Sequence, residues 1–378
     1  GGGCEGRGGK WEVGGREAGW LTCEVLGPVG EHRGLRALPE PTPGELVVGM
    51  EGGHVVGDEG LGYLFGISEF ITLPLAGRDG EGVSQPQHHA FWAHDSAAEK
   101  RAFEQVMDFL IERLNRNPDL HVYHYAAYEP NALKELAGTY ATREQEVDRL
   151  LRGRVLVDLY RVVRQSVQVG TESYSLKELE ALYRSKRTTD IVDAGASIVA
   201  YEEWLDSRDQ RKLDAILAYN ADDCLSTAQL RDWLEARRIE GIAKYGDIPR
   251  PGPEKSEPKE NLRDIDERTA AVLERLLDGV PEEEEKRSAE QQARYLLGHS
   301  LNWHRREAKS EWWEYYRKGT LTDGQLMADP ESIGGLEFRG EVCQEKRSNS
   351  LRYSFDPTPE DKISVGDGPQ DPPRLEGA

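Results

Sequence analysis

Tyr219 and Asp223 are four residues apart in a stretch whose apolar residues recur at helical spacing, so they share one face of a predicted helix. A tyrosine hydroxyl beside a carboxylate can orient a water molecule and help to hold a metal ion. Asp222 lies one step further round the same helix. Taken alone, the pattern describes an exposed helix with solvated acids at least as well. The catalytic interpretation therefore requires acids from other elements.

Two further segments supply such acids. Residues 45–51 predict a strand on which Gly49 and Glu51 share one face. Residues 121–125 predict another strand, and the turn after it leads to Glu129 at the start of a helix. A strand, a strand-to-helix junction and a helix thus each contribute a carboxylate. Oxygen ligands of this kind suit hard divalent cations such as Mg²⁺.

Short motifs accompany these acids along the chain. They are Arg33-Gly34-Leu35, Leu38-Pro39-Glu40-Pro41, Tyr63-Leu64-Phe65-Gly66, Tyr123-His124-Tyr125, Tyr128-Glu129, Val157-Asp158-Leu159-Tyr160, Tyr174-Ser175-Leu176-Lys177, Tyr219-Asn220 and Asp222-Asp223-Cys224. Together they resemble the DEDD exonucleases of the RNase H-like superfamily, in the subclass with a tyrosine in the last motif. The similarity is closest to the RNase H-like domain of bacterial RecB-like nuclease and helicase fusion proteins. It implies an α/β fold, with an RNase H-like mixed sheet flanked by helices and a helical C-terminal extension.

The resemblance also implies an activity and a set of site residues. The activity is hydrolysis of phosphodiester bonds from a 3′ end, in single-stranded DNA or RNA, with two Mg²⁺ or Mn²⁺ ions. Glu51, Glu129 and Asp223 would hold the metals, with Glu129 standing where the family pattern has an aspartate, and Tyr219 would position the attacking water. A helicase, separate or fused, would be the partner in DNA repair.

The first motif departs from the family pattern, which is Asp-x-Glu with a further aspartate two residues later. Here Gly49 and Gly53 flank Glu51, so both aspartates are glycine. Glu45 shares the face of Glu51 but lies roughly 13 Å from Gly49 along an extended strand, too far to substitute. We therefore expect weak metal binding and slow or absent cleavage, with Gly49→Asp raising both. The alternative function is a catalytically inactive module that holds nucleic acid or a partner in a repair assembly.

Composition limits the function classes. The chain has 378 residues and a net charge of −21, which argues against a broad electrostatic DNA-binding surface. A carboxylate-lined nuclease site remains compatible with this charge, because bound cations let a phosphate approach. The four cysteines have no zinc or iron–sulfur spacing, and no apolar run approaches the length of a membrane span. The sequence has no phosphate-loop motif, so ATP hydrolysis is not expected. The N-terminus has no signal-peptide pattern, so a cytoplasmic location is expected.

Composition also predicts the organisation of the chain. Residues 1–40 are rich in glycine and lack periodicity, so we expect them to be disordered or at most loosely structured. Residues 41–240 predict the RNase H-like domain and residues 241–260 a linker. Residues 261–320 predict the helical extension, and residues 321–378 an irregular tail preceding a missing helicase region.

Four smaller predictions concern individual side chains. Asp158 is expected to cap the helix that follows it, and Ser175 with Glu178 to form a capping box. Cys224 is expected on the buried side of its helix. Three histidines lie close together in a connection, and they are His88, His89 and His94. They could ligate a metal, but their spacing is not regular, and we expect them to be solvated.

Overall fold

The structure is a computed structural model of the chain, in which two compact units, Gly1–Trp303 and His304–Ala378, are distinguished. The residues that it describes are 12–13, 16–17, 22–27, 33–53, 56, 60–70, 87–184, 187, 189, 191, 193–252, 260–281, 284–301, 336–345 and 348–355, with scattered positions between 303 and 335.

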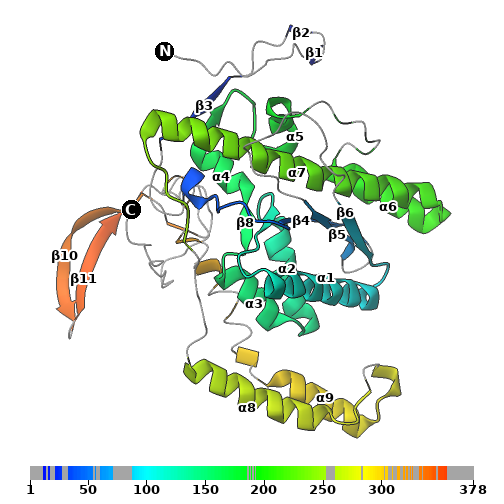
Figure 1. Cartoon of the computed structure of the whole chain (residues 1–378). Coiled ribbons are helices and arrows are strands. Elements are labelled where there is room, and N and C mark those ends of the chain that lie inside the picture. The colour runs from blue at the N-terminus through cyan, green and yellow to red at the C-terminus, as the bar shows by residue number, and fades with distance from the viewer. Residues whose placement is uncertain are drawn as a thin grey trace. The chain divides into compact units, whose positions relative to one another are not determined.

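A five-stranded mixed sheet forms the centre of the first unit (Figure 1). Its order is β6-β5-β4-β7-β8, with strands at Gln87–Trp92, Leu61–Glu69, Leu46–Gly53, Val122–His124 and Leu156–Asp158. The strands β4, β5 and β6 pair antiparallel, whereas β7 runs parallel to β4, and β8 runs parallel to β7. The predicted mixed sheet is therefore confirmed.

The central strand β4 is buried on both faces. Leu46, Val47 and Val48 are each at most 2% exposed, so the strand reads as a continuous apolar run at its start. Alternation still decides which side each residue faces, because the position of Gly49 is directed toward Asn220 and Cys224 of the long helix above. The predicted shared face of Gly49 and Glu51 is thus the face that this helix covers.

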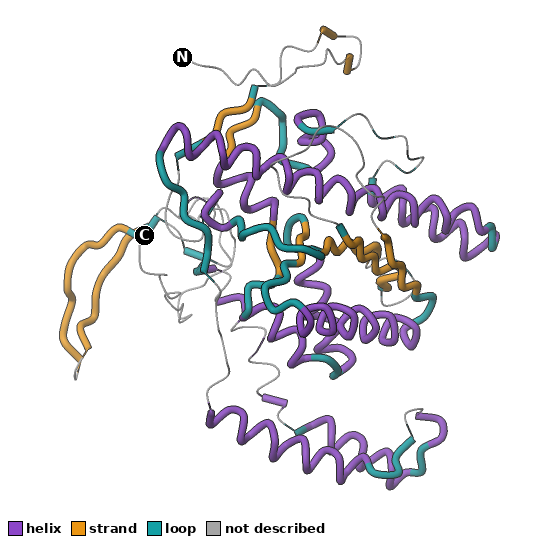
Figure 2. Tube along the Cα trace, viewed as in Figure 1, coloured by secondary structure: helices purple, strands orange, loops and turns teal. Residues whose placement is uncertain are grey.

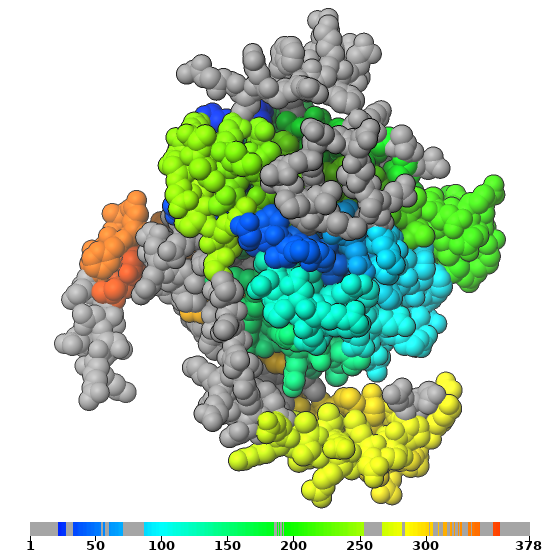
Figure 3. Space-filling view, viewed as in Figure 1, coloured from blue at the N-terminus to red at the C-terminus, as the bar shows by residue number. Residues whose placement is uncertain are grey.

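Among the described residues of the first unit, seven helices surround the sheet. They are α1 (Ser96–Arg116), α2 (Tyr128–Tyr140), α3 (Glu144–Arg152), α4 (Leu159–Ser166), α5 (Leu176–Leu179), α6 (Ala194–Ser207) and α7 (Gln210–Tyr245), with a 3₁₀ turn η2 at Glu180–Leu182. Figures 1 and 2 show α1 to α3 on one side of the sheet and α6 and α7 on the other. Figure 3 shows the segment leading into β4, in blue, at the surface between these two groups.

Of the two predicted helix caps, the one at Asp158 is confirmed and the one at Ser175 is confirmed in part. The Asp158 carboxylate accepts hydrogen bonds from backbone N–H groups in the first turn of α4, and also from Ala126 N at 3.0 Å. Ser175 caps α5 by accepting from Glu178 N. The Glu178 carboxylate, however, accepts from Ser173 N at 2.7 Å, so half of the predicted box is formed.

The N-terminal boundary differs from the prediction. Strand β3 (Cys23–Val25) pairs antiparallel with β9 (Val167–Val169), and the 3₁₀ turn η1 (Gly34–Ala37) is followed by the buried Leu38. The core therefore begins well before residue 41. Isolated apolar residues such as Leu38 show no periodicity, yet they bury as completely as those of a regular element. The described part of the first 20 residues is a two-stranded pair, β1 (Glu12–Val13) with β2 (Arg16–Glu17).

The C-terminal part also departs from its predicted boundaries. Helix α7 continues through residue 245, into the predicted linker. The helical extension is confirmed by α8 (Glu260–Leu277) and α9 (Ala289–Ser300), which pack against each other and are joined through η3 (Glu284–Lys286). In the second unit, β10 (Glu337–Glu345) and β11 (Ser348–Ser354) form an antiparallel hairpin where an irregular tail was predicted. No helix in the described ranges is long and apolar enough to cross a membrane.

Candidate active site

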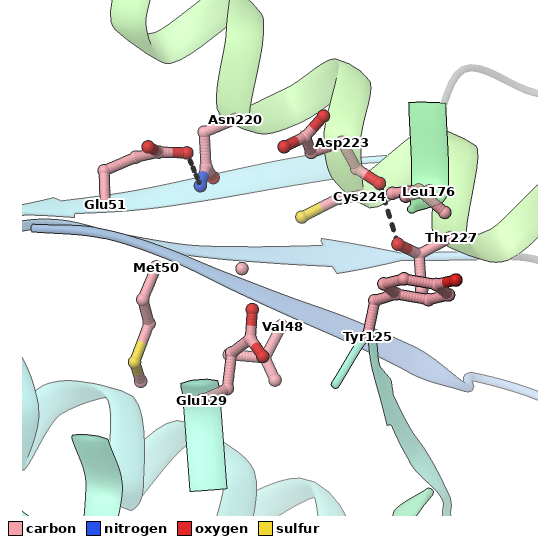
Figure 4. Close-up of a pocket in the computed structure, with 11 residues that line it drawn as sticks. Val48, Met50, Glu51, Tyr125, Glu129, Leu176, Asn220, Asp223, Cys224 and Thr227 are labelled. Atoms are coloured by element: carbon pink, nitrogen blue, oxygen red, sulfur yellow. Dashed lines mark hydrogen bonds between the residues drawn. The ribbon is translucent and has the colours of Figure 1, made fainter. Parts of the chain in front are cut away.

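A cavity of about 160 Å³ lies where α7 crosses β4. Its lining residues come from β4, the β7–α2 connection, α2, α5 and α7, and they are Val48, Gly49, Met50, Glu51, Tyr125, Glu129, Leu176, Asn220, Asp223, Cys224 and Thr227. Three of the four predicted site residues, Glu51, Glu129 and Asp223, therefore line one cavity (Figure 4). Tyr219 is the fourth, and its hydroxyl is hydrogen-bonded to Asp223.

Glu51 is buried against α7. Its Oε1 accepts a hydrogen bond from Asn220 Nδ2 at 3.2 Å (Figure 4). The Ser197 hydroxyl of α6 also donates a hydrogen bond to the Glu51 carboxylate. Burial raises the pKa of Glu51 to about 7, and the Asp223 carboxylate adds to the rise, while the Asn220 hydrogen bond opposes it. Glu51 is therefore easier to protonate than an exposed glutamate.

Glu129 enters the cavity from the first turn of α2. Burial raises the pKa of Glu129 to about 8, with the negative charges of Asp158 and Glu51 adding to it. Its Oε2 is buried and has no hydrogen-bond partner among the described residues. His124 Nδ1 is 3.9 Å away, but it donates to Ala126 O at 2.7 Å, and burial lowers the pKa of this histidine. Glu129 thus has one buried oxygen available to a ligand.

Asp223 and Tyr219 lie at the other end of the site, among cations. The Arg187 guanidinium forms an ion pair with Asp223 Oδ1. The Tyr219 hydroxyl donates to Asp223 and accepts from Lys177 Nζ at 2.9 Å, and this ammonium also lies 4.8 Å from the centre of the tyrosine ring. Burial raises the pKa of Asp223, although Arg187 opposes the rise. Tyr219 and Asp223 therefore lie side by side as predicted, and the hydrogen bonds from Lys177 and to Asp223 orient the tyrosine hydroxyl.

Arg187 itself is a functional candidate that sequence reasoning missed. It lies between η2 and α6, and its side chain is only 10% exposed. The guanidinium contacts both oxygens of Glu180 and lies 3.3 Å from Asp222. Asp222, which neighbours the predicted site, is thereby shared with Arg184, whose guanidinium donates at 2.6 Å. Of the missed residues, Lys177 and Asn220 fall in quoted motifs, whereas Arg187 has no local signal.

Gly49 and Gly66 explain how closely α7 approaches the sheet. They are partners across β4 and β5. A Cβ at Gly66 would lie 1.8 Å from Asn220 Oδ1, and one at Gly49 would lie 3.1 Å from Cys224 Sγ and 3.3 Å from Asn220 Nδ2. Position 49 does face the cavity, as predicted, but a side chain there must displace a buried neighbour. Cys224 is 1% exposed, which confirms its predicted burial.

The predicted solvated histidines are wrong in detail, because His88 and His89 belong to β6. His88 Nδ1 shares a 2.8 Å hydrogen bond with Ser68 Oγ, and burial lowers the pKa of His88 to about 4. His89 pairs with Glu69 at 2.9 Å. The ring of His94 lies 4.4 Å from that of Trp204. The edge strand β6 was not predicted, because its sequence does not alternate clearly between apolar and polar residues.

The donor set has the chemistry of a site for a hard divalent cation, with oxygen ligands that include the unpartnered Oε2 of Glu129. No group of three or more His, Cys, Asp or Glu side chains in the described part of the chain is arranged around one point to hold a metal. The carboxylates that line the cavity therefore suit an ion that is held by few protein ligands, as Mg²⁺ often is. Waters or phosphate oxygens would complete its coordination shell.

Comparison with family models matches residues 60–235 to the RNase H superfamily. The match extends from the start of β5 into α7 and includes Glu129, Tyr219 and Asp223, while Glu51 lies before it. Together with the order of the five strands, it shows an RNase H-like α/β fold in this part of the chain. Neither the search of curated proteins nor that of solved structures found a match.

Proposed function

We propose that this chain is a metal-dependent nuclease of the DEDD type, in the tyrosine subclass, which hydrolyses phosphodiester bonds from the 3′ end of single-stranded DNA or RNA. One observation supports it above the others: Glu51, Glu129 and Asp223, from three separate elements, line the same cavity. An RNase H superfamily match that includes two of these carboxylates supports the same reaction class. The Glu129 Oε2 is buried without a hydrogen-bond partner among the described residues, which a purely structural role would not explain and a metal ligand would.

Each residue has a role in this proposal. Glu51, Glu129 and Asp223 hold the metal ions, and Tyr219 orients the attacking water through a hydroxyl that Lys177 and Asp223 already fix. Bound Mg²⁺ or Mn²⁺ supplies Lewis-acid stabilisation of the charge that develops on the phosphate. Burial of the two glutamates keeps bulk water from screening them, so their interaction with a cation is strong.

The setting of the activity follows from the resemblance to RecB-like fusion proteins. We propose a cytoplasmic DNA-repair enzyme that acts with a helicase, either a partner or a fused domain. Gly49 removes one metal ligand, so cleavage by the natural chain is slow.

A catalytically inactive module that holds nucleic acid is the second candidate, favoured by Gly49 and by the ion pair that already neutralises Asp223. Labelled single strands of DNA and RNA, carrying the label at either end, separate the two. Stepwise loss from the 3′ end with Mn²⁺, none with chelator, and none for Glu129→Gln supports the nuclease. Glu112→Gln, on the exposed face of α1, is the matched control. Metal-dependent binding of the strand without cleavage would instead establish the holding module.

A further inference from the structure

We propose that Arg187 is the resident counter-cation of Asp223, and that it limits the chain to one divalent ion, bound at the Glu51–Glu129 end of the cavity, until Arg187 is displaced. The inference rests on the proposed function and deepens it, because it concerns the metal content of the same site. It differs from the two-metal expectation, in which Asp223 is a ligand from the outset.

The first reason is that Arg187 is held in place. Its guanidinium contacts Glu180 through two nitrogens and Asp223 through a third, and its Nε is 3.3 Å from Asp222. Glu180 is in turn fixed by a hydrogen bond from Ser226 of α7. A side chain held by three carboxylates in a nearly buried position does not leave without a competing partner.

The second reason is charge balance at this end of the cavity. The three acids Glu180, Asp222 and Asp223 are matched by three cations, Arg184, Arg187 and Lys177. These contacts join the α5–η2 segment and the connection after it to α7. A divalent ion that approached Asp223 would meet no net negative charge and would face the Arg187 guanidinium directly.

The third reason is that negative charge is not balanced at the Glu51–Glu129 end of the cavity. Glu51 receives hydrogen bonds from the neutral groups of Asn220 and Ser197. Among the described residues, neither Glu51 nor Glu129 forms an ion pair with a lysine or arginine, and His124 is committed to Ala126 O. In the described part of the chain, these two buried carboxyl groups, one with an unpartnered oxygen, therefore have no lysine or arginine paired with them. A single divalent ion supplies the missing charge.

Calorimetric titration of the full chain with Mn²⁺ tests the inference. We expect one ion per wild-type chain and two for Arg187→Gln, which releases Asp223. The double variant Arg187→Gln with Asp223→Asn should return to one. Arg184→Gln removes one of the two arginines paired with Asp222 and leaves the Arg187–Asp223 pair in place, so it is the matched control and should stay at one.

A second arm covers the case in which Arg187→Gln does not fold. Asp223→Asn in the otherwise natural chain should change the Mn²⁺ dissociation constant by less than about twofold, whereas Glu129→Gln should weaken it by more than tenfold. Two ions bound by the wild type, or a tenfold loss of affinity in Asp223→Asn, would overturn the inference and leave the proposed metal site standing. Failure of both the wild type and folded Arg187→Gln to bind Mn²⁺ would overturn the proposed function with it.

Discussion

At the residue scale, burial makes two ordinary glutamates unusual. Glu51 and Glu129 have pKa values of about 7 and about 8, against 4.5 for an exposed glutamate, because both lie under the sheet's covering helices. A carboxyl group whose pKa is raised on folding favours the native state at low pH, where it is protonated in both states. As the pH rises from 4.5 through 8, the unfolded chain ionises first, so stability falls. The metal-free protein should therefore be more stable at pH 5 than at pH 8.5.

Glu129→Gln isolates this effect. In chelator at pH 8.5 the variant should be more stable to urea than the wild type, by on the order of a few kcal/mol, because the amide cannot ionise. At pH 5 the two proteins should unfold at similar urea concentrations, since the wild-type carboxyl is then neutral. The exposed Glu112→Gln change should have no such pH dependence. An equal effect at both pH values would show that Glu129 is not buried in its neutral form.

Tyr219→Phe tests the proposed role of the hydroxyl. The change removes the bonds to Asp223 and Lys177 but keeps the buried ring. Cleavage should slow by on the order of 10- to 100-fold, as for loss of one positioning hydroxyl, while the Mn²⁺ dissociation constant changes by less than about twofold. Measuring both in the same preparation decides the role. A parallel loss of metal affinity would make the tyrosine a support for the metal ligands instead.

The sequence could predict part of this site and not the rest. Tyr219 and Asp223 share a helix face by spacing alone, and the strand patterns supplied Glu51 and Glu129, to which the family resemblance gave a role as metal ligands. The cation that engages Asp223 could not be predicted, because Arg187 is 36 residues away in the chain and belongs to no periodic element. Long-range ion pairs of this kind depend on how a connection folds back, which spacing does not encode.

At the element scale, the contact between α7 and β4 sets what the site can hold. Helix α7 is 36 residues long and presents Asn220 and Cys224 directly above Gly49. The first-motif glycine therefore serves close helix–sheet packing as well as marking a missing ligand. This revises the expectation that Gly49→Asp alone raises metal affinity, because its Cβ would lie 3.1 Å from Cys224 Sγ.

We predict that Gly49→Asp lowers the melting temperature in chelator, through this crowding and through repulsion from Glu51. Gly49→Asp combined with Cys224→Ala should recover part of that loss and should bind Mn²⁺ more tightly than the wild type by tenfold or more. Cys224→Ala alone is the control for the space that it opens. Melting with and without Mn²⁺, beside calorimetry, gives both quantities. If the double variant gains no affinity, position 49 does not reach the ion.

Regular elements were predictable where periodicity was strong. The strand predicted at 45–51 is found at 46–53, and the strand predicted at 121–125 is found at 122–124. The contribution of β3 to the core was not predictable, because a three-residue strand pairs with β9, more than 140 residues further along the chain. The pairing partner of β3 is therefore not encoded near it in the sequence.

At the scale of the whole molecule, the net charge of −21 restricts how nucleic acid can bind. A protein that neutralises 6 to 10 phosphates loses on the order of 10³- to 10⁵-fold in affinity between 50 and 200 mM salt. We expect a far weaker dependence here, below about tenfold, because contact depends on a metal-bridged phosphate and few cations. In chelator, binding should be lost, since the buried carboxylates then repel the strand.

Fluorescence polarisation with a labelled phosphorothioate strand, which resists cleavage, measures this directly. Binding in Mn²⁺ should be detectable at micromolar protein, absent in chelator, and weakened more than tenfold by Glu129→Gln, while Glu112→Gln matches the wild type. The metal requirement and the weak dependence of affinity on salt both come from the acidic cavity beneath α7. A variant that loses one of these properties should therefore lose the other. Strong binding in chelator with a steep salt slope would instead show a basic surface that carries the strand independently of Glu51, Glu129 and Asp223.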